Sequence, residues 1–362
     1  MFLTSCKAYN MRAAFTVYCI LLLSIKVAAQ TDSLKFDPNY YERYPYKLII
    51  SPFLVKSYNG LALSTPGAKE DISYISNSPA GVGLRVGYDW FSVSASYGIS
   101  AIDKNFKSKG KTKALNLQTN FMARNFVLDV YFQKYSGMYL RAHNLPAYNA
   151  QPYYVRPDID NKLLGVSASW VFNGKKFSIR PPFKFDGWQK KSAGSFLAGV
   201  EYLMGSAQSD SAFIPAAYKK DFAHSNVNMV KYTLFGPNVG YGHTFVIGRH
   251  FFVSALGTLN ADVSHTQEFS LDNAVNRRWN FAPNIYFRGG IGYNTPAWEV
   301  AFSYFTKRLY LSGMSHDNRY RNYNDDCRLS YTRRVHPGKR IPKAVNWAGN
   351  IIEKLGLGFL IK

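Results

Sequence analysis

The sequence has 362 residues and a mass of 41.0 kDa, which allows one large domain or two modest ones. Aromatic residues make up 16% and charged residues only 18%, a composition that argues against a disordered chain or a coiled coil and favours many strands. The formal net charge of +22 points to polyanionic surroundings such as nucleic acid or anionic lipid, and three cysteines are too few for a disulfide framework. We therefore expect an all-β protein.

Residues 1–29 have the pattern of a secretory signal peptide, in which a basic start is followed by an apolar stretch and by small residues before Gln30. The apolar stretch is shorter than the about 20 residues that a spanning helix needs. We expect cleavage before Gln30, which would leave Cys327 as the remaining cysteine and residues 30–45 as an N-terminal periplasmic segment. Secretion argues against nucleic acid as a partner.

Beyond the signal, large apolar residues alternate with small or polar ones. From residue 91 to 100, for example, apolar side chains occupy the odd positions, and serine or glycine the even ones. Successive residues of a strand point to opposite faces, so a period of two predicts strands with one apolar face. Twelve such strands are predicted, at residues 46–57, 80–88, 91–101, 112–123, 125–137, 162–173, 193–207, 231–247, 250–264, 281–294, 297–311 and 324–335.

Strand length and the second face distinguish a membrane barrel from a soluble sandwich. The predicted strands have roughly 9 to 17 residues, which matches or exceeds the tilted span of a bilayer. Tyrosines and tryptophans near the strand ends fit two interfacial girdles. In a barrel, the face that carries Gly, Ser, Asn and charges would line a polar lumen. We expect a lumen charge network there, made of Arg85, Asp129, Glu201, Asp262, Arg288, Glu299 and Arg328.

The connections alternate between long loops and tight turns. Tight turns are expected at residues 89–90, 124, 248–249 and 295–296, and long loops at residues 58–79, 102–111, 138–161, 208–230, 265–280 and 312–323. Outer-membrane barrels show this alternation, with short turns in the periplasm and long loops outside the cell. We therefore predict a transmembrane antiparallel up-and-down β-barrel over residues 46–335 in a bacterial outer membrane.

One connection breaks the pattern, because residues 174–192 are too long for a periplasmic turn. Three alternatives are open for this segment. It would fold into the lumen, lie under the wall, or add a strand pair that raises the count to fourteen.

A resemblance to a known family is carried by residues 177–180 and 188–197, by residues 240–245 and 249–254, and by residues 328–334. These stretches resemble domain-of-unknown-function family 4421, secreted outer-membrane barrels of the Bacteroides and Flavobacterium group, over roughly residues 35–336. The chain departs from the family pattern at Pro181-Pro182 and in the tail beyond His336. The resemblance implies a barrel and an outer membrane, and it implies no reaction.

No group of residues has the spacing of a catalytic or metal site. Asp262, Ser264 and His265 are the best candidates for lipid hydrolysis, but adjacent strand residues face apart, so Ser264 and His265 are poorly placed for proton transfer. His243 has no second histidine or cysteine at ligand spacing. We expect no cofactor, no metal and no recognisable catalytic site. The alternative is a barrel-embedded hydrolase that acts on envelope lipids.

A loop near residues 103–113 is a candidate for contact with anionic lipid, because on the outer side it would face the phosphates of lipopolysaccharide. The alternative is a solvated hairpin tip. Its basic residues are Lys104, Lys107, Lys109, Lys111 and Lys113.

The tail over residues 336–362 has two interpretations. Ala344, Ala348, Ile351, Ile352 and Leu355 share one helical face, which predicts an amphipathic helix on the inner leaflet or the barrel base. The alternation near the C-terminus would instead fit a closing strand, but an even count of twelve strands disfavours it.

The expected function follows from this architecture. Barrels of about this size have interiors that side chains largely fill, so we expect a narrow or plugged pore, or a structural or surface-binding envelope protein. The expected partners are outer-membrane lipid and lipopolysaccharide, and the barrel-assembly machinery during insertion. The sequence does not set the oligomeric state.

Overall fold

The computed structural model describes residues 36–44, 46–66, 68, 71–88, 91–99, 106–122, 124–140, 153–313, 318–338 and 340–354. The expected signal peptide lies outside these residues. In the described part of the chain, no helix is both long and apolar enough to cross a membrane.

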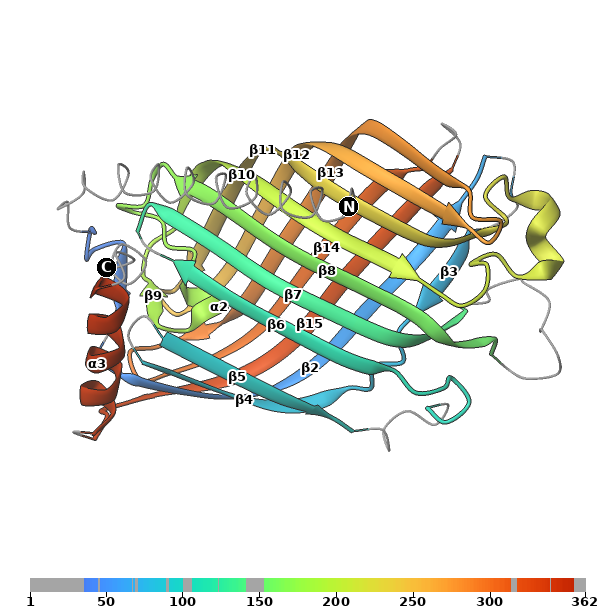
Figure 1. The fold of residues 1–362 in the computed structure, drawn as a ribbon. Coiled ribbons are helices and arrows are strands. Elements are labelled where there is room, and N and C mark those ends of the chain that lie inside the picture. The colour runs from blue at the N-terminus through green and yellow to red at the C-terminus, as the bar shows by residue number, and fades with distance from the viewer. Residues whose placement is uncertain are drawn as a thin grey trace.

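Long antiparallel strands wrap around one axis and form the wall of a barrel (Figure 1). The strands of the wall are β2 (Leu48–Ser64), β3 (Ile72–Ile75), β4 (Gly81–Tyr88), β5 (Phe91–Gly98), β6 (Lys113–Met122), β7 (Phe126–Leu140), β8 (Val155–Val171), β10 (Ala193–Gln208), β11 (Val227–Ile247), β12 (Phe251–Ser270), β13 (Val275–Asn294), β14 (Trp298–Ser312) and β15 (Arg319–Val335). An all-β antiparallel barrel is therefore confirmed.

The two ends of the barrel differ. At the turn end, on the left in Figure 1, tight connections join β11 to β12 and β13 to β14. The helix α3 (Arg340–Lys354) also lies there. At the loop end, on the right, longer connections include residues 209–226, which contain the short 3-10 helix η3 (Ala216–Asp221).

Ten strands close the ring by hydrogen bonding. The last strand, β15, pairs with the first wall strand, β2, from Val335 opposite Leu48 to Arg319 opposite Ser64. At the loop end, the short β3 bridges β2 and β7, with Tyr74 opposite Leu140. The remaining members of the ring follow in chain order from β7 to β15.

The wall is built differently at the turn end. There β4 takes the place of β3 beside β2, β5 pairs with β4, and β6 pairs with β7. Over the described residues, β5 and β6 do not pair with each other, so the sheet has two free edges here. Asn77 holds the connection between β5 and β6, because its side chain donates to the carbonyl oxygens of Phe106 (2.8 Å) and Gly110 (2.6 Å) in that connection.

Each of the twelve predicted strands corresponds to an observed strand, but several loop-end boundaries are wrong. Residues 58–79 are predicted as a loop, whereas β2 continues to Ser64 and β3 follows it. β11, β12 and β13 likewise extend into residues predicted as loops and reach 20 or 21 residues. The cause is that backbone pairing continues past the apolar band, where the side chains no longer alternate clearly.

The two faces of the wall are reversed relative to a soluble protein. On β12, Phe251, Val253, Leu259 and Val263 are exposed on the outside, and buried Ser, Asn, Asp and Thr side chains alternate with them on the inside. Neighbouring strands repeat this arrangement, with Phe196 on β10 68% exposed and the adjacent Ser195 buried. The polar face is therefore the enclosed one.

Residues 174–192 fold into the turn end of the barrel, which is the first of the three alternatives. They contain the short helix α2 (Pro181–Lys184) and β9 (Gly187–Gln189), and β9 pairs with β1 (Tyr41–Arg43) in a separate two-stranded sheet. They add no strand to the wall. In the tail, α3 is helical over its described residues, and residues 355–362 lie outside the described part of the chain.

We predict that a single cysteine substitution closes the barrel covalently. Lys56 on β2 lies directly opposite Cys327 on β15, and paired strand residues are close enough for a disulfide. Lys56→Cys should therefore form a disulfide with Cys327 on mild oxidation, detected as loss of free thiol by alkylation and mass spectrometry.

The matched control is Leu54→Cys, because Leu54 lies opposite Leu329 and only diagonally from Cys327. Diagonal neighbours are about 7–8 Å apart, beyond the usual disulfide range. Equal oxidation of the two variants would contradict the β2 to β15 register.

Candidate functional site

The turn end of the lumen is filled by a plug, which we define as residues 36–44 and 172–192. Its apolar side chains pack on inward-facing residues of the wall, as Phe177 and Ile179 do on Leu197 and Leu256. The two segments of the plug also bind each other, since the Tyr41 hydroxyl donates to the Gly174 carbonyl (2.8 Å). Burial raises the pKa of Tyr41 to about 12, so this hydroxyl stays protonated.

A buried ion pair holds the plug in shape. Arg180 binds both carboxylate oxygens of Asp186, and its remaining terminal nitrogen donates to the carbonyl of Met122 at the end of β6. Burial on its own would raise the pKa of Asp186, but the positive charges of Arg180, Lys184 and Arg43 lower it to about 2. The Asp186 carboxylate is therefore ionised at any ordinary pH.

Arg334 on β15 anchors the plug to the wall. Its guanidinium donates to Glu299 (2.5 Å) and Asn294 (2.9 Å) of the wall, and to the carbonyls of Phe185 (2.9 Å) and Gly187 (3.2 Å) in the plug. A fifth bond reaches a carbonyl in the β13 to β14 turn. Arginine has five N–H donors, so every donor of this side chain is used. On β4, two strands from β15, Arg85 donates to the Phe183 carbonyl (2.9 Å).

Charged side chains also cross the middle of the lumen. Arg288 on β13 binds Asp129 on β7, which is on the far side of the ring in strand order. Lys307 lies 3.9 Å from Glu201 and sits over the rings of Tyr131 and Tyr286 at 4.1 and 4.2 Å from their centroids. We call these residues the middle layer. A cavity of about 50 Å³, room for a few water molecules, separates it from the plug.

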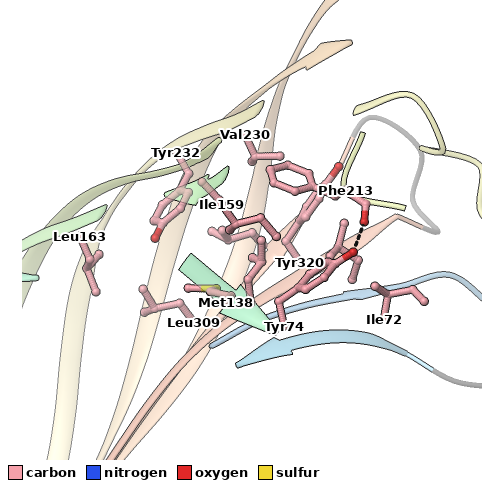
Figure 2. Close-up of a cluster of buried hydrophobic side chains, with 14 of the residues drawn as sticks. Ile72, Tyr74, Met138, Ile159, Leu163, Phe213, Val230, Tyr232, Leu309 and Tyr320 are labelled. Carbon is pink, nitrogen blue, oxygen red and sulfur yellow. Dashed lines mark hydrogen bonds between the residues drawn. The ribbon is translucent and has the colours of Figure 1, made fainter. Parts of the chain in front are cut away.

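A hydrophobic cluster fills the loop end (Figure 2). Residues 209–226 turn inwards, so Phe213 is fully buried, and its carbonyl accepts a hydrogen bond from Tyr74 (2.6 Å). Figure 2 shows Tyr74, Phe213 and Tyr320 facing one another. The described part of the lumen is therefore occupied at both ends and in the middle.

All seven residues predicted to line the lumen point inwards. They do not form one network, because some pair with an opposite charge and others contact neutral groups. Asp129 meets Arg288, whereas Glu201 meets Lys307 and accepts from Tyr286 (2.6 Å). Among the rest, Asp262 accepts from Asn284 (2.7 Å), Glu299 binds Arg334, Arg85 binds the plug, and Arg328 lies over the Phe53 ring at 4.4 Å.

Four of the charged residues that form the plug, its anchor and the middle layer were not predicted from the sequence. Lys307 has the same parity as Glu299 on β14, and Arg334 the same parity as Arg328 on β15, so strand alternation was a usable signal for both. No such signal existed for Arg180 and Asp186, because they lie outside the wall strands.

The residues considered for hydrolysis are not brought together. Asp262 and Ser264 are buried inside the wall, and His265 is stacked on Trp279 at the outer surface, with 4.6 Å between ring centroids. In the described part of the chain, no three His, Cys, Asp or Glu side chains are grouped for metal binding.

The loop lysines lie at the loop end. Lys109 sits over the rings of Tyr139 and Tyr153, at 5.9 and 5.6 Å from the centroids, and Lys107 and Lys111 are exposed. Lys113 is exposed at the start of β6, and Lys104 lies outside the described residues. Contact with anionic lipid remains a prediction for this loop.

A family model described as Domain of unknown function (DUF4421) matches residues 31–330. The chain belongs to this family. The stretches that carry the resemblance gather at the turn end: residues 177–180 and 188–197 build the plug and the start of β10, residues 240–245 pair with that start, and residues 328–334 end at the anchor Arg334. These stretches thus coincide with the plug and its attachment to the wall.

No curated protein matches the sequence. Among solved structures, the chain is similar to a FadL homologue of Pseudomonas aeruginosa (11% identity, TM-score 0.27, covering 80% of this chain and 92% of that one). It is also similar to OmpT of Vibrio cholerae (9% identity, TM-score 0.27, 83% and 100%) and to the toluene transporter TodX of Pseudomonas putida (9%, 0.22, 84% and 93%). At these values the matches identify neither a substrate nor a strand number.

We predict that the plug depends on the Arg180 to Asp186 pair. Asp186→Asn leaves a buried guanidinium without its counter-charge and should lower the free energy of unfolding by about 3 kcal/mol. Urea unfolding in detergent micelles, followed by tryptophan fluorescence, measures the change. The control is Glu42→Gln, which breaks the half-exposed pair of Glu42 with Lys190 (3.5 Å) in the same plug and should cost less than ~1 kcal/mol. Equal losses of unfolding free energy in the two variants would contradict a special role of the Arg180 to Asp186 pair in holding the plug.

The pH dependence of this difference has a definite sign. A carboxylate with a lowered pKa stabilises the fold fully above its unfolded value of about 4, and the contribution disappears as the pH falls through the folded value. The stability difference between wild type and Asp186→Asn should therefore be constant above about pH 5 and shrink towards pH 2. A difference that already shrinks near neutral pH would refute the assignment.

Proposed function

We propose that this protein is an outer-membrane barrel that does not conduct solutes and acts as a structural or surface-binding part of the cell envelope. The exposed apolar side chains on the outside of the strands support the membrane location. Such a continuous apolar band far exceeds the few hundred Å² usual on soluble monomers. Hydrocarbon is the solvent in which these side chains would be stable.

Stacked aromatic rings at the turn end support the same location. Trp188, His250, Tyr293 and Trp298 form a stack with successive ring centroids 5.2 or 5.3 Å apart. Aromatic residues of this kind are enriched where a membrane meets water. With the loop end outside the cell, α3 and the plug would face the periplasm.

The filling of the lumen is the observation that carries the proposal of a closed barrel. A solute would have to displace the plug with its buried ion pairs, the middle layer and the loop-end cluster in succession. Buried pairs of this kind are costly to separate, because each partner would be left as an isolated charge. We therefore favour a structural or surface-binding role over a diffusion pore.

The hydrolase alternative is not supported by the placement of its candidate residues. Ser264 and His265 lie on opposite faces of β12, so His265 cannot take a proton from the Ser264 hydroxyl directly. We do not propose an enzymatic reaction for this chain.

We predict that the purified protein gives no steady current steps in a planar lipid bilayer. Insertion should be verified on the same preparation by flotation with lipid vesicles and by protease protection of the wall strands. Reproducible current steps of uniform size would refute the proposal and would favour the function of a narrow pore instead.

A further inference from the structure

A row of polar and basic side chains crosses the outer surface of the wall near the loop end. Its members are directly paired residues of six neighbouring strands, and they alternate with buried lumen residues such as Leu163 and Tyr232, so they point outwards. From β7 to β13 this basic row consists of Lys134, Lys162, Ser206, Lys231, Gln267 and Arg277.

The basic row borders the apolar band directly. The next row towards the turn end has Phe132, Leu164, Met204, Thr233, His265 and Trp279, and the row after it has Val130, Val166, Tyr202, Phe235, Val263 and Phe281. Paired rows on one face are two residues apart, about 7 Å along a strand. The surface therefore changes from apolar to cationic over the distance that separates the chains of a lipid from its headgroup.

A groove of about 440 Å³ lies at the centre of the row. Lys162 and Lys231 stand on either side of Ser206, each directly opposite it on a neighbouring strand. Leu164 and Met204 line the groove towards the apolar band. Two lysines and one serine thus border the groove, and the Lys231 ammonium lies over the Phe269 ring, 5.1 Å from its centroid.

The row carries four basic side chains and no carboxylate of its own. None of Lys134, Lys162, Lys231 and Arg277 forms an ion pair within the described part of the chain. In the neighbouring row on the loop-end side, Asp160 is the one acidic residue. Lys134 and Lys162 are directly opposite each other, an arrangement that destabilises a sheet unless an anion lies nearby.

We propose that the groove and the basic row bind the phosphate groups of a membrane lipid, whose acyl chains lie along the two apolar rows below. This inference rests on the proposed function, since it needs the barrel to stand in a bilayer. Lys162 and Lys231 are two strand spacings apart, about 10 Å, and the row continues to Lys134 and Arg277. This width suits a lipid with more than one phosphate and several chains.

The test compares two variants that remove the same charge. Lys162→Gln with Lys231→Gln changes the groove, and Lys219→Gln with Lys220→Gln changes exposed lysines of η3 at the same end. Each protein, in neutral detergent micelles, is titrated with diphosphorylated lipid A, and binding is followed by native mass spectrometry. The groove variant should bind roughly 30-fold more weakly than wild type, from the usual contribution of a lysine near a lipid phosphate. The η3 variant should change little.

Titrations with other ligands, and with a variant that keeps the charge, identify the group that is bound. Dephosphorylated lipid A should bind no more tightly than phosphatidylcholine, and millimolar inorganic phosphate should not displace the phosphorylated lipid. Lys162→Arg with Lys231→Arg keeps the charge and should restore most of the affinity, which separates a charge effect from misfolding. Equal weakening in the groove and η3 variants would overturn the proposal, as would displacement by free phosphate. A conducting protein that still binds lipid through the groove would refute only the closed-barrel function.

Discussion

Enclosure of charge is the constraint on which the rest of the structure depends. Between the turn end and the basic row the outside of the wall is apolar, so the charged residues of this part of the strands are concentrated on the inner face, where little water is available. A buried charge is tolerated only with an opposite charge or several hydrogen bonds. The Arg334 to Glu299 pair, with both side chains at most 1% exposed, satisfies this condition at the turn end, and the Arg288 to Asp129 pair satisfies it in the middle. Filling the lumen is therefore a consequence of stabilising the wall.

Strand alternation was sufficient to locate every strand of the wall except β3. The odd and even positions of β12 differ so clearly that the inner and outer faces followed from the sequence, and strand alternation likewise gave the inward direction of Asp262 and Glu299. Tight turns between β11 and β12 and between β13 and β14 fixed the order of neighbours. These signals are local, and for that reason a single sequence contains them.

The features that the sequence did not reveal depend on contacts between distant segments. The ring of ten closes because β3 touches both β2 and β7, and the free edges of β5 and β6 follow from that contact. The plug pairs β1 with β9, whose residues are almost 150 positions apart, as in the contact of Tyr41 with Gln189. Loop-end strands continue through Arg277 and Asn322, where hydrogen bonding between backbones replaces the apolar pattern. The partners of Arg180 and Arg334 were hidden for the same reason.

The plug draws its contacts from the whole length of the chain, and this has a consequence for how the protein folds. Tyr41 comes from its beginning, Arg85 and Met122 from its first third, and Arg334 from the last strand. The segment in the middle of the chain cannot reach its final bonds until the last strand has arrived beside the first. Complete seating of the plug therefore requires the closed ring, and a chain that lacks β15 would have neither.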